Sequence, residues 1–237
     1  MLFLTSWDDG HPSDLRLADM LSKYNLKGTF FVPAFNKEGR EVLAKEQLRR
    51  LDQNFEIGGH TLTHCYLNGL PDDVLKHEIC AGKAALEDDL GHAVNGFCYP
   101  GGVFDSRTIQ AVQAAGFDYA RTVENLCFDL GKSAWLMPTS FQFYPHSAFV
   151  LAKNAIKYPR ISKFNIVRMR WSEKEFMRFM EAQLAAAHHH SSVFHLWGHS
   201  WELDEHDLWG KLESFFKLTA HYPIQALTLF EAHQLKN

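Results

Sequence analysis

The sequence predicts a single α/β domain built on a parallel sheet. Short apolar runs typical of buried strands alternate with amphipathic stretches typical of helices. No repeat, low-complexity stretch or linker-like segment interrupts this alternation. A chain of 237 residues with 46% hydrophobic side chains can bury one sizeable core, and an α/β barrel can use this length as one domain. We therefore expect one domain over residues 1–237, with parallel strands joined by helices.

The first half of the chain contains alternating strands and helices. The opening run Leu2–Leu4 is apolar, and Asp14–Tyr24 carries leucine and methionine side chains at helical spacing. Pro71–Leu90 is the clearest helix, because a proline stands in its first turn beside two aspartates and Gly91 ends it. The same alternation predicts further strands at Gly28–Pro33, Phe55–Gly58 and Phe97–Tyr99, and further helices at Lys45–Leu51 and Ser106–Ala115.

The second half continues the pattern after one irregular stretch. Phe117–Thr122 is a predicted strand, whereas residues 124–170 lack clear periodicity and predict a long loop with a short helix. In repeated βα units of this kind, functional residues collect at the carboxyl ends of the strands. The remaining expected elements are a helix at Glu173–Ala187, a strand at Ser192–Trp197, a helix at Asp204–Thr219, a strand at Gln225–Thr228 and a C-terminal helix.

Two polar motifs stand at such strand ends. Asp8 and Asp9, before Gly10, follow the first apolar run, and His60 and His64 follow the third predicted strand. Each motif alone is weak, because Asp-Asp-Gly is most often a turn and histidines four residues apart often lie on a solvated helix. Because both occur at strand ends of one small chain, together they indicate a functional site.

The spacing and the residue types favour a metal site. One helical turn would place His60 and His64 on one face, about 5–6 Å apart at Cβ. Two imidazoles and one carboxylate form an open zinc site whose remaining position is left for water or substrate. Because neighbouring strand residues point to opposite faces, one aspartate can bind the metal while the other handles protons. This division of labour is typical of a metal-assisted hydrolase.

Four short motifs resemble, in the right order, those of the polysaccharide deacetylases, carbohydrate esterase family 4. They are SWDDG at Ser6–Gly10, HTLTH at His60–His64, YPGG at Tyr99–Gly102 and LWGH at Leu196–His199. The resemblance extends over nearly the whole chain, and its first two motifs are specific in combination. It implies a distorted (β/α)7 barrel, one divalent metal and hydrolysis of an N-acetyl or O-acetyl group on a sugar or polysaccharide. Zinc is the metal expected first, with Co2+, Ni2+ and Mn2+ as alternatives.

Carried over position by position, the resemblance makes Asp8 the general base and assigns three metal ligands: Asp9, His60 and His64. The metal would polarise the acetyl carbonyl and lower the pKa of a bound water, whose proton Asp8 takes. A backbone N–H of Gly101 would help to hold the oxyanion. The expected substrate-binding residues are Tyr99, Pro100, Gly101 and Trp197.

A histidine near the last motif is the expected general acid, because the leaving amine needs a proton and a pKa near 6.5 suits that role. His195 and His199 are both candidates. His199 is preferred because it follows the apolar run at the strand end, whereas His195 lies mid-strand and suits a buried, hydrogen-bonded core position. Leu196, Trp197 and Trp201 are candidates for the wall around the acetyl methyl group, although each also suits core packing.

The chain departs from the family at the start of the third motif. Where the family commonly has an arginine that pairs with the catalytic base, this chain has Cys98. A buried aspartate without a cationic partner tends to be protonated and cannot act as a base. Arg121, at the end of the next strand, could supply the charge or could be a surface arginine. The family's fourth motif, an aspartate-tryptophan pattern, is not evident, which leaves the substrate more open than the reaction.

Composition limits the kinds of partner and the cellular location that we expect for this protein. The net charge of −4 gives no reason to expect nucleic acid or an anionic membrane as a partner. No signal peptide or apolar span is recognisable, so we expect a cytoplasmic protein. The four cysteines contain no CxxC pair and are expected to be reduced and mostly buried. No sequence feature fixes an oligomeric state.

Two other functions remain open. The same fold could carry a C–N hydrolase for a small cyclic amide or ureide, although the complete set of Asp9, His60 and His64 argues against a metal-independent enzyme. The third hypothesis is a carbohydrate-binding module with a structural metal. Structural zinc sites usually close with four protein ligands, and a binding module has no use for a base such as Asp8.

Overall fold

The computed structural model describes residues 1–145, 173–190 and 192–235, which are built around one sheet. The described strands follow the order β5-β4-β3-β2-β1-β7-β6, and β8 pairs with the start of β1. These strand pairs are all parallel. The strands are β1 (Leu2–Asp8), β2 (Thr29–Val32), β3 (Glu56–Gly59), β4 (Gly96–Cys98), β5 (Tyr119–Arg121), β6 (Phe141–Gln142), β7 (Val193–His199) and β8 (Gln225–Leu227).

The sheet curls because one short segment contacts both of its edges. Met137 forms a parallel bridge with Arg121 at the end of β5. Further along the chain, Phe141 of β6 pairs with Leu196 of β7. The stretch between Met137 and Phe141 therefore joins the two edges, and the molecule is the distorted (β/α)7 barrel that the motifs predict.

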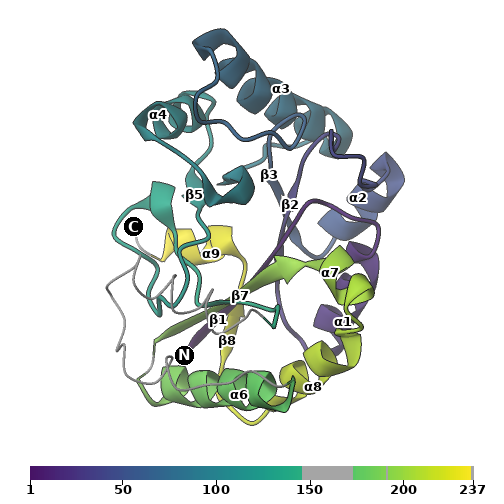
Figure 1. Ribbon diagram of the computed structural model, residues 1–237, viewed down its shortest axis with the longest axis vertical. Helices are drawn as coiled ribbons and strands as arrows, with labels where there is room; N and C mark the ends of the chain where they lie inside the picture. The colour runs from purple at the N-terminus through teal and green to yellow at the C-terminus, as the bar shows by residue number, and fades with distance from the viewer. Residues whose placement is uncertain (146–172, 191, 236–237) are drawn as a thin grey trace.

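Helices surround the curled sheet (Figure 1). In this view α1 and α2 lie on the right, α3 and α4 at the top, and α6 and α8 at the bottom. Short 3-10 turns, η1 (Pro100–Gly102) and η2 (Ala134–Leu136), follow β4 and β5. The helices are α1 (Asp14–Lys23), α2 (Lys45–Asp52), α3 (Asp72–Leu90), α4 (Ser106–Ala114), α6 (Glu173–His189), α7 (Ser200–Glu205), α8 (Trp209–Thr219) and α9 (Leu229–Gln234).

Side-chain alternation along the strands divides the buried residues between two cores. In β1, Leu4 points into the barrel, where it packs in one cluster with Phe31, Tyr119 and residues of α9. Phe3 and Trp7, on the opposite face, belong to the larger core between the sheet and the surrounding helices. Asp8 has the parity of Leu4, so its side chain points into the barrel at the carboxyl end of β1.

The order of predicted strands and helices is confirmed, with two differences in detail. The predicted helix Asp204–Thr219 starts only at Trp209, as α8, and a separate helix, α7, begins earlier than predicted, at Ser200. The two are divided because Asp207 has a left-handed φ of 48° that a helix does not continue. Strand β6 lies in the stretch expected to be irregular, and with two residues it is too short to leave an alternating pattern. Residues 146–170 of that stretch lie outside the described residues.

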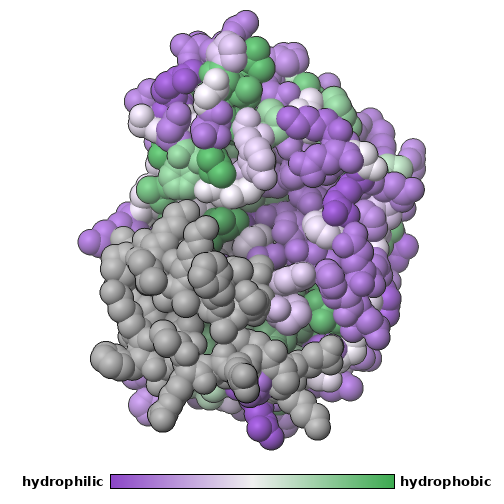
Figure 2. Space-filling model, in the orientation of Figure 1, coloured by the Kyte–Doolittle hydropathy of each residue, from purple (hydrophilic) through white to green (hydrophobic). Residues whose placement is uncertain are grey.

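Hydrophilic side chains cover most of the surface over α2 and α7 on the face shown in Figure 2. Within the described parts of the chain, no helix is both long enough and apolar enough to cross a bilayer. None of the four cysteines, all in described segments, forms a disulfide. Three of them are buried and Cys80 is exposed, in agreement with the expectation of mostly buried thiols.

Candidate metal centre and active site

Strand parity gathers polar side chains at one end of the barrel interior. Asp8 ends β1 and pairs in register with His199, which ends β7. Val193, at the start of β7, packs in the interior core. His195, Trp197 and His199 follow it at alternate positions, so they face the same interior at increasing height. The carboxyl end of the barrel therefore holds the candidate base and the preferred candidate acid.

Asp9, His60 and His64 lie together at this end. Asp9 Oδ1 is 3.1 Å from His64 Nε2 and 3.6 Å from His60 Nε2. Ligand atoms about 2.0–2.2 Å from a tetrahedral zinc ion lie roughly 3.3–3.6 Å apart, so one observed distance is within this range and the other is slightly shorter. Burial opposes the charge of Asp9, but the facing histidines hold its pKa well below the usual value. The residues present therefore fit a three-ligand metal centre.

The histidine pair does not lie on a helix, contrary to the expectation from its spacing. Strand β3 ends at Gly59, and the next residues turn sharply, with φ of 70° at Thr61 and 57° at His64. This turn brings the His60 and His64 rings to 4.9 Å between centroids. Left-handed φ is uncommon in residues other than glycine, and such strain collects at functional sites.

The two adjacent aspartates face the same cavity rather than opposite faces of the sheet. Asp8 is the last residue of β1, and Asp9 has a left-handed φ of 78°. Asp9 has thus already left the strand, so strand alternation no longer applies to it. The expectation of opposite faces was wrong for this reason, although the two carboxylates still have different neighbours.

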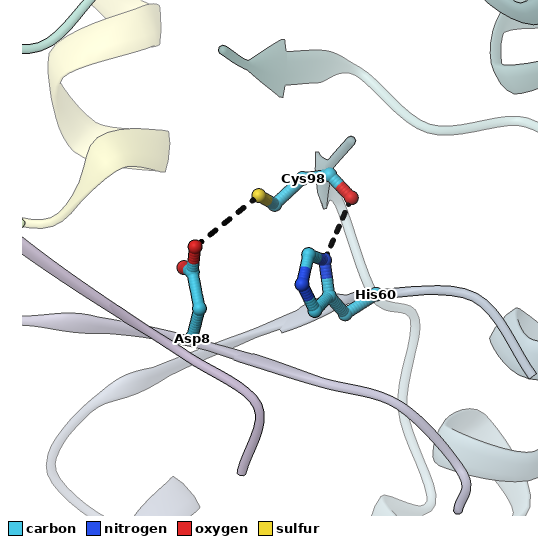
Figure 3. A group of neighbouring side chains, drawn as sticks. All are labelled: Asp8, His60 and Cys98. Atoms are coloured by element: carbon cyan, nitrogen blue, oxygen red, sulfur yellow. Dashed lines mark hydrogen bonds between the residues drawn. The ribbon is translucent and has the colours of Figure 1, made fainter. Parts of the chain in front are cut away.

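His60 is oriented through the nitrogen that does not face Asp9. Its Nδ1 lies 2.8 Å from the backbone carbonyl oxygen of Cys98 (Figure 3). A carbonyl oxygen only accepts hydrogen bonds, so Nδ1 carries the proton and Nε2 keeps a lone pair for a metal. Burial lowers the pKa of His60 to about 4, so the ring is neutral at pH 7 and able to bind a metal.

Asp8 is held by Arg121 and Cys98. Arg121 Nη2 donates to Asp8 Oδ1 in a buried ion pair, and the Cys98 thiol lies 3.7 Å from Asp8 Oδ2 (Figure 3). Cys98 and Arg121 are register partners on β4 and β5. Burial opposes the charge of Arg121, but the Asp8 carboxylate raises the pKa of the guanidinium. Arg121 is fully buried, so it is not a surface arginine.

The two candidate acids have different surroundings. His195 is buried with both nitrogens engaged, Nδ1 at 2.9 Å from the Pro138 carbonyl oxygen and Nε2 at 2.8 Å from the Ser6 hydroxyl. Burial lowers the pKa of His195 to about 3. His199 Nδ1 lies 2.9 Å from Glu202 Oε2. Burial opposes the charge of His199, but this hydrogen bond and nearby carboxylates raise its pKa to about 9.

One cavity of about 280 Å³ is lined by five of these residues, Asp8, Asp9, His60, His64 and His199, whereas the enclosed His195 does not reach it. Of the predicted substrate-binding residues, Gly101 and Trp197 line it, whereas Tyr99 and Pro100 do not. Both residues are buried. Tyr99 follows Cys98, which faces the barrel interior, so the Tyr99 ring points to the outer core. Leu196 belongs to the outer core for the same reason, so it is not part of a wall around an acetyl group.

Several residues of the site carried no sequence motif. Glu38, Arg40, Tyr66 and Val123 line the cavity from loops that follow β2, β3 and β5. Such loop positions follow from tertiary structure and leave no periodic signal. Glu202 was also missed, although its position three residues after His199 at the start of α7 is a spacing at which helical side chains meet.

Sequence comparisons identify relatives of this chain. The family model for polysaccharide deacetylases matches residues 2–120, half of the chain. The peptidoglycan-N-acetylglucosamine deacetylase of Bacillus cereus is 28% identical over 114 residues, which cover 47% of this chain and 52% of that protein. The Bacillus subtilis protein YxkH, assigned to the same family, is 27% identical over 123 residues, covering 51% of this chain and 44% of YxkH. The chain thus matches about half the length of these curated relatives.

Solved structures share the fold over a larger part of the chain. A polysaccharide deacetylase structure from Mycobacterium smegmatis has a TM-score of 0.70 and 17% identity, covering 98% of this chain and 89% of that chain. A family 4 acetyl xylan esterase from Clostridium thermocellum, solved with a cobalt ion, has a TM-score of 0.58 and 16% identity, covering 100% and 92%. From the family match over half of its length, together with the shared barrel, the chain belongs to the polysaccharide deacetylase family.

Proposed function

We propose that the chain is a metal-dependent deacetylase that removes an N-acetyl group from a sugar or polysaccharide. One observation carries the proposal: the cluster of Asp9, His60 and His64 shares a cavity with Asp8 and His199. A metal centre, a base and an acid in one cavity are the groups that hydrolysis of an amide needs. Membership of the deacetylase family supports the same reaction.

Asp9, His60 and His64 would hold one divalent metal, zinc first among the candidates, through Oδ1 and the two Nε2 atoms. A metal held there supplies polarisation of the acetyl carbonyl and lowers the pKa of a water from 15.7 to about 7. Two imidazoles and one carboxylate leave a position open for water and substrate, as catalytic zinc sites do.

Asp8 would take the proton of the attacking water. Its Oδ1 accepts from Arg121, so Oδ2, which faces the Cys98 thiol, is the oxygen left for this transfer. Arg121 is buried and its pKa is raised, so it stays charged and keeps the Asp8 carboxylate in one orientation. Asp8 and Asp9 thereby have separate roles in the same cavity.

His199 would give a proton to the leaving amine. With a pKa of about 9, its ring is protonated at neutral pH. Its Nδ1 is engaged by Glu202, so the proton leaves from Nε2. The Gly101 backbone N–H, in a turn with φ of 60°, would donate to the oxyanion that forms from the acetyl group.

The saccharide would rest on aromatic side chains at the cavity. Trp197, Trp201 and Tyr66 line it, and Tyr66 is 59% exposed at its edge. Ligand sites combine such apolar surfaces with a few placed polar groups. The names of relatives support an acetylated saccharide as the substrate class, because one of them acts on N-acetylglucosamine of peptidoglycan.

Acetate release from an N-acetylated chito-oligosaccharide tests this function, on protein stripped of metal and then reconstituted with zinc. We expect no acetate from the stripped protein and restored release with zinc. Asp8→Asn should lower the rate by about 10²–10⁴-fold, which is the usual contribution of a general base, and should leave stoichiometric zinc binding. Asp73→Asn, the same substitution at an exposed position of α3, is the matched control.

Each contrary result contradicts a different part of the proposal. Absence of zinc binding would contradict the metal centre, and a fully active Asp8→Asn variant would contradict the base. Zinc binding without acetate release would contradict the substrate and favour the cyclic amide hydrolase. Acetylated xylo-oligosaccharides, assayed in parallel, separate N-acetyl from O-acetyl hydrolysis.

A further inference from the structure

Trp201 contacts the candidate metal ligand Asp9 from a neighbouring element. It lies in α7, the short helix that follows β7 directly. Its indole Nε1 donates a hydrogen bond of 2.8 Å to Asp9 Oδ2. The other oxygen of this carboxylate, Oδ1, faces His60 and His64. The two oxygens of Asp9 therefore have different partners: the histidine pair on one side and the indole on the other.

The indole ring is itself held in place. The guanidinium carbon of Arg40 lies 3.4 Å from the centroid of the Trp201 ring, a cation–π contact. Arg40 Nη1 also donates to Glu205 Oε1 at 3.1 Å, and Glu205 belongs to the same helix as Trp201. The His199 ring lies 5.2 Å from the Trp201 ring between centroids. Trp201 thus has fixed neighbours at its N–H and at its ring.

We propose that Trp201 is a positioning residue that holds Asp9 in a one-oxygen binding mode toward the metal, with Arg40 fixing the indole. This inference rests on the proposed function, because it assumes a metal held by Asp9, His60 and His64. A carboxylate that binds through both oxygens would take up a position that water and substrate need. The indole N–H donates to Oδ2 and so turns this oxygen away from the metal, and it is neutral, so it adds no charge to the centre.

A role in packing alone makes a different prediction from a role in positioning. Partners of a metal ligand orient it, and their removal typically weakens metal binding by about 10–100-fold. Trp201→Phe keeps an aromatic ring against Arg40 and deletes the N–H together with the five-membered part of the indole, a loss that the control variant below reproduces. We therefore expect the zinc Kd of this variant to rise by about 10–100-fold, and the absorption spectrum of the Co2+-loaded protein to change as Asp9 gains freedom to bind through both oxygens.

The chain offers a matched control in Trp209. Its Nε1 also donates to an aspartate, Asp204 Oδ1, at 2.8 Å, and the Arg16 guanidinium lies 4.2 Å from its ring centroid. Asp204 is exposed and belongs to no candidate metal cluster among the described residues. Trp209→Phe removes the same type of hydrogen bond, so its zinc Kd and Co2+ spectrum should equal those of the wild type.

The experiment is a zinc titration in competition with a chelator, on the full chain and the two variants, with Co2+ spectra beside it. Equal Kd values for Trp201→Phe and wild type, or equal losses for Trp201→Phe and Trp209→Phe, would overturn the inference. A wild type that binds no zinc would overturn the proposed function instead. If Trp201→Phe does not fold, Arg40→Leu replaces it as the test variant. Arg40→Leu keeps the indole N–H but removes the cation that fixes the ring. Unchanged zinc binding in Arg40→Leu would then overturn the inference.

Discussion

Arg121 forms a buried ion pair with Asp8, although 113 residues separate them in the sequence. Arg121 stands on β5 beside Cys98 of β4, and the Cys98 thiol faces the other oxygen of Asp8. The small cysteine leaves room for the long arginine side chain to reach Asp8 from one strand farther away. The positive charge that the family commonly places at the start of its third motif is thus supplied here from the neighbouring strand.

An exchange of these two side chains tests that relationship. Arg121→Cys should lower the free energy of unfolding by about 3–5 kcal/mol, because it leaves the Asp8 carboxylate buried without its cation. The double variant Cys98→Arg/Arg121→Cys returns arginine to the family's usual position and should recover part of the stability and activity. Urea unfolding and acetate release measure both quantities. Wild-type stability in Arg121→Cys would show that the ion pair has no such role.

The contact between His199 and Glu202 predicts how kcat depends on pH. We expect His199→Gln to lower kcat by about 10²–10⁴-fold and to leave zinc bound. Because Glu202 raises the pKa of His199, Glu202→Gln should lower that pKa. The acid form would then be lost at lower pH, so the alkaline limb of the kcat profile should move to lower pH. The profile of Glu202→Gln against wild type checks this, and an unmoved limb would exclude His199 as the acid.

The lowered pKa of His195 predicts that the protein loses stability in acid. Its pKa is about 3 in the folded protein, against about 6.5 in an unfolded chain. The unfolded state therefore binds a proton first, and folding loses free energy as pH falls from about 6.5 toward 3, by at most about 1.4 kcal/mol per pH unit. Above pH 6.5 the residue contributes no pH dependence. Between pH 7 and pH 5, the free energy of unfolding should therefore fall by about 2 kcal/mol less in His195→Gln than in the wild type.

Urea unfolding curves at several pH values measure this difference. His60 also has a lowered pKa, of about 4, so the His195→Gln variant should retain part of the acid sensitivity. A variant whose stability falls with pH as steeply as the wild type would contradict a neutral His195 in the folded protein.

The backbone conformation of Gly101 and its closeness to Tyr66 predict that a side chain at this position lowers activity. It has φ of 60°, and a Cβ built there would lie 2.3 Å from Cε1 of Tyr66. Gly101→Ala should therefore strain the turn, displace the Tyr66 ring and lower kcat. Gly91→Ala is the matched control, because Gly91 has φ of 83° but no atom within 4 Å of its Cβ position. We expect both variants to lose similar stability, by roughly 1–2 kcal/mol, and only Gly101→Ala to lose kcat. Equal kcat values in the two variants would contradict this role of Gly101.

Local sequence patterns predicted most of the elements that carry the site. Apolar runs, a proline at the start of α3 and Gly91 after it depend on neighbours in the chain, and they predicted the alternation of strands and helices. The same patterns did not predict the division between α7 and α8, which turns on one left-handed residue, Asp207. They also mistook the turn at His60–His64 for a helix, because helices and tight turns both bring residues four apart close together.

By itself, the sequence determined the alternation of strands and helices, the motifs through which the chain resembles its family and its barrel, and the residue types of a candidate metal centre, because these depend on periodicity and on spacing within single segments. Only the tertiary structure decided that Arg121 meets Asp8, that His195 is enclosed while His199 lines the cavity, and that Trp201 meets Asp9. Such contacts join segments far apart in the chain. Strand register and the curl of the sheet set their distances, and neither quantity is encoded in any one segment.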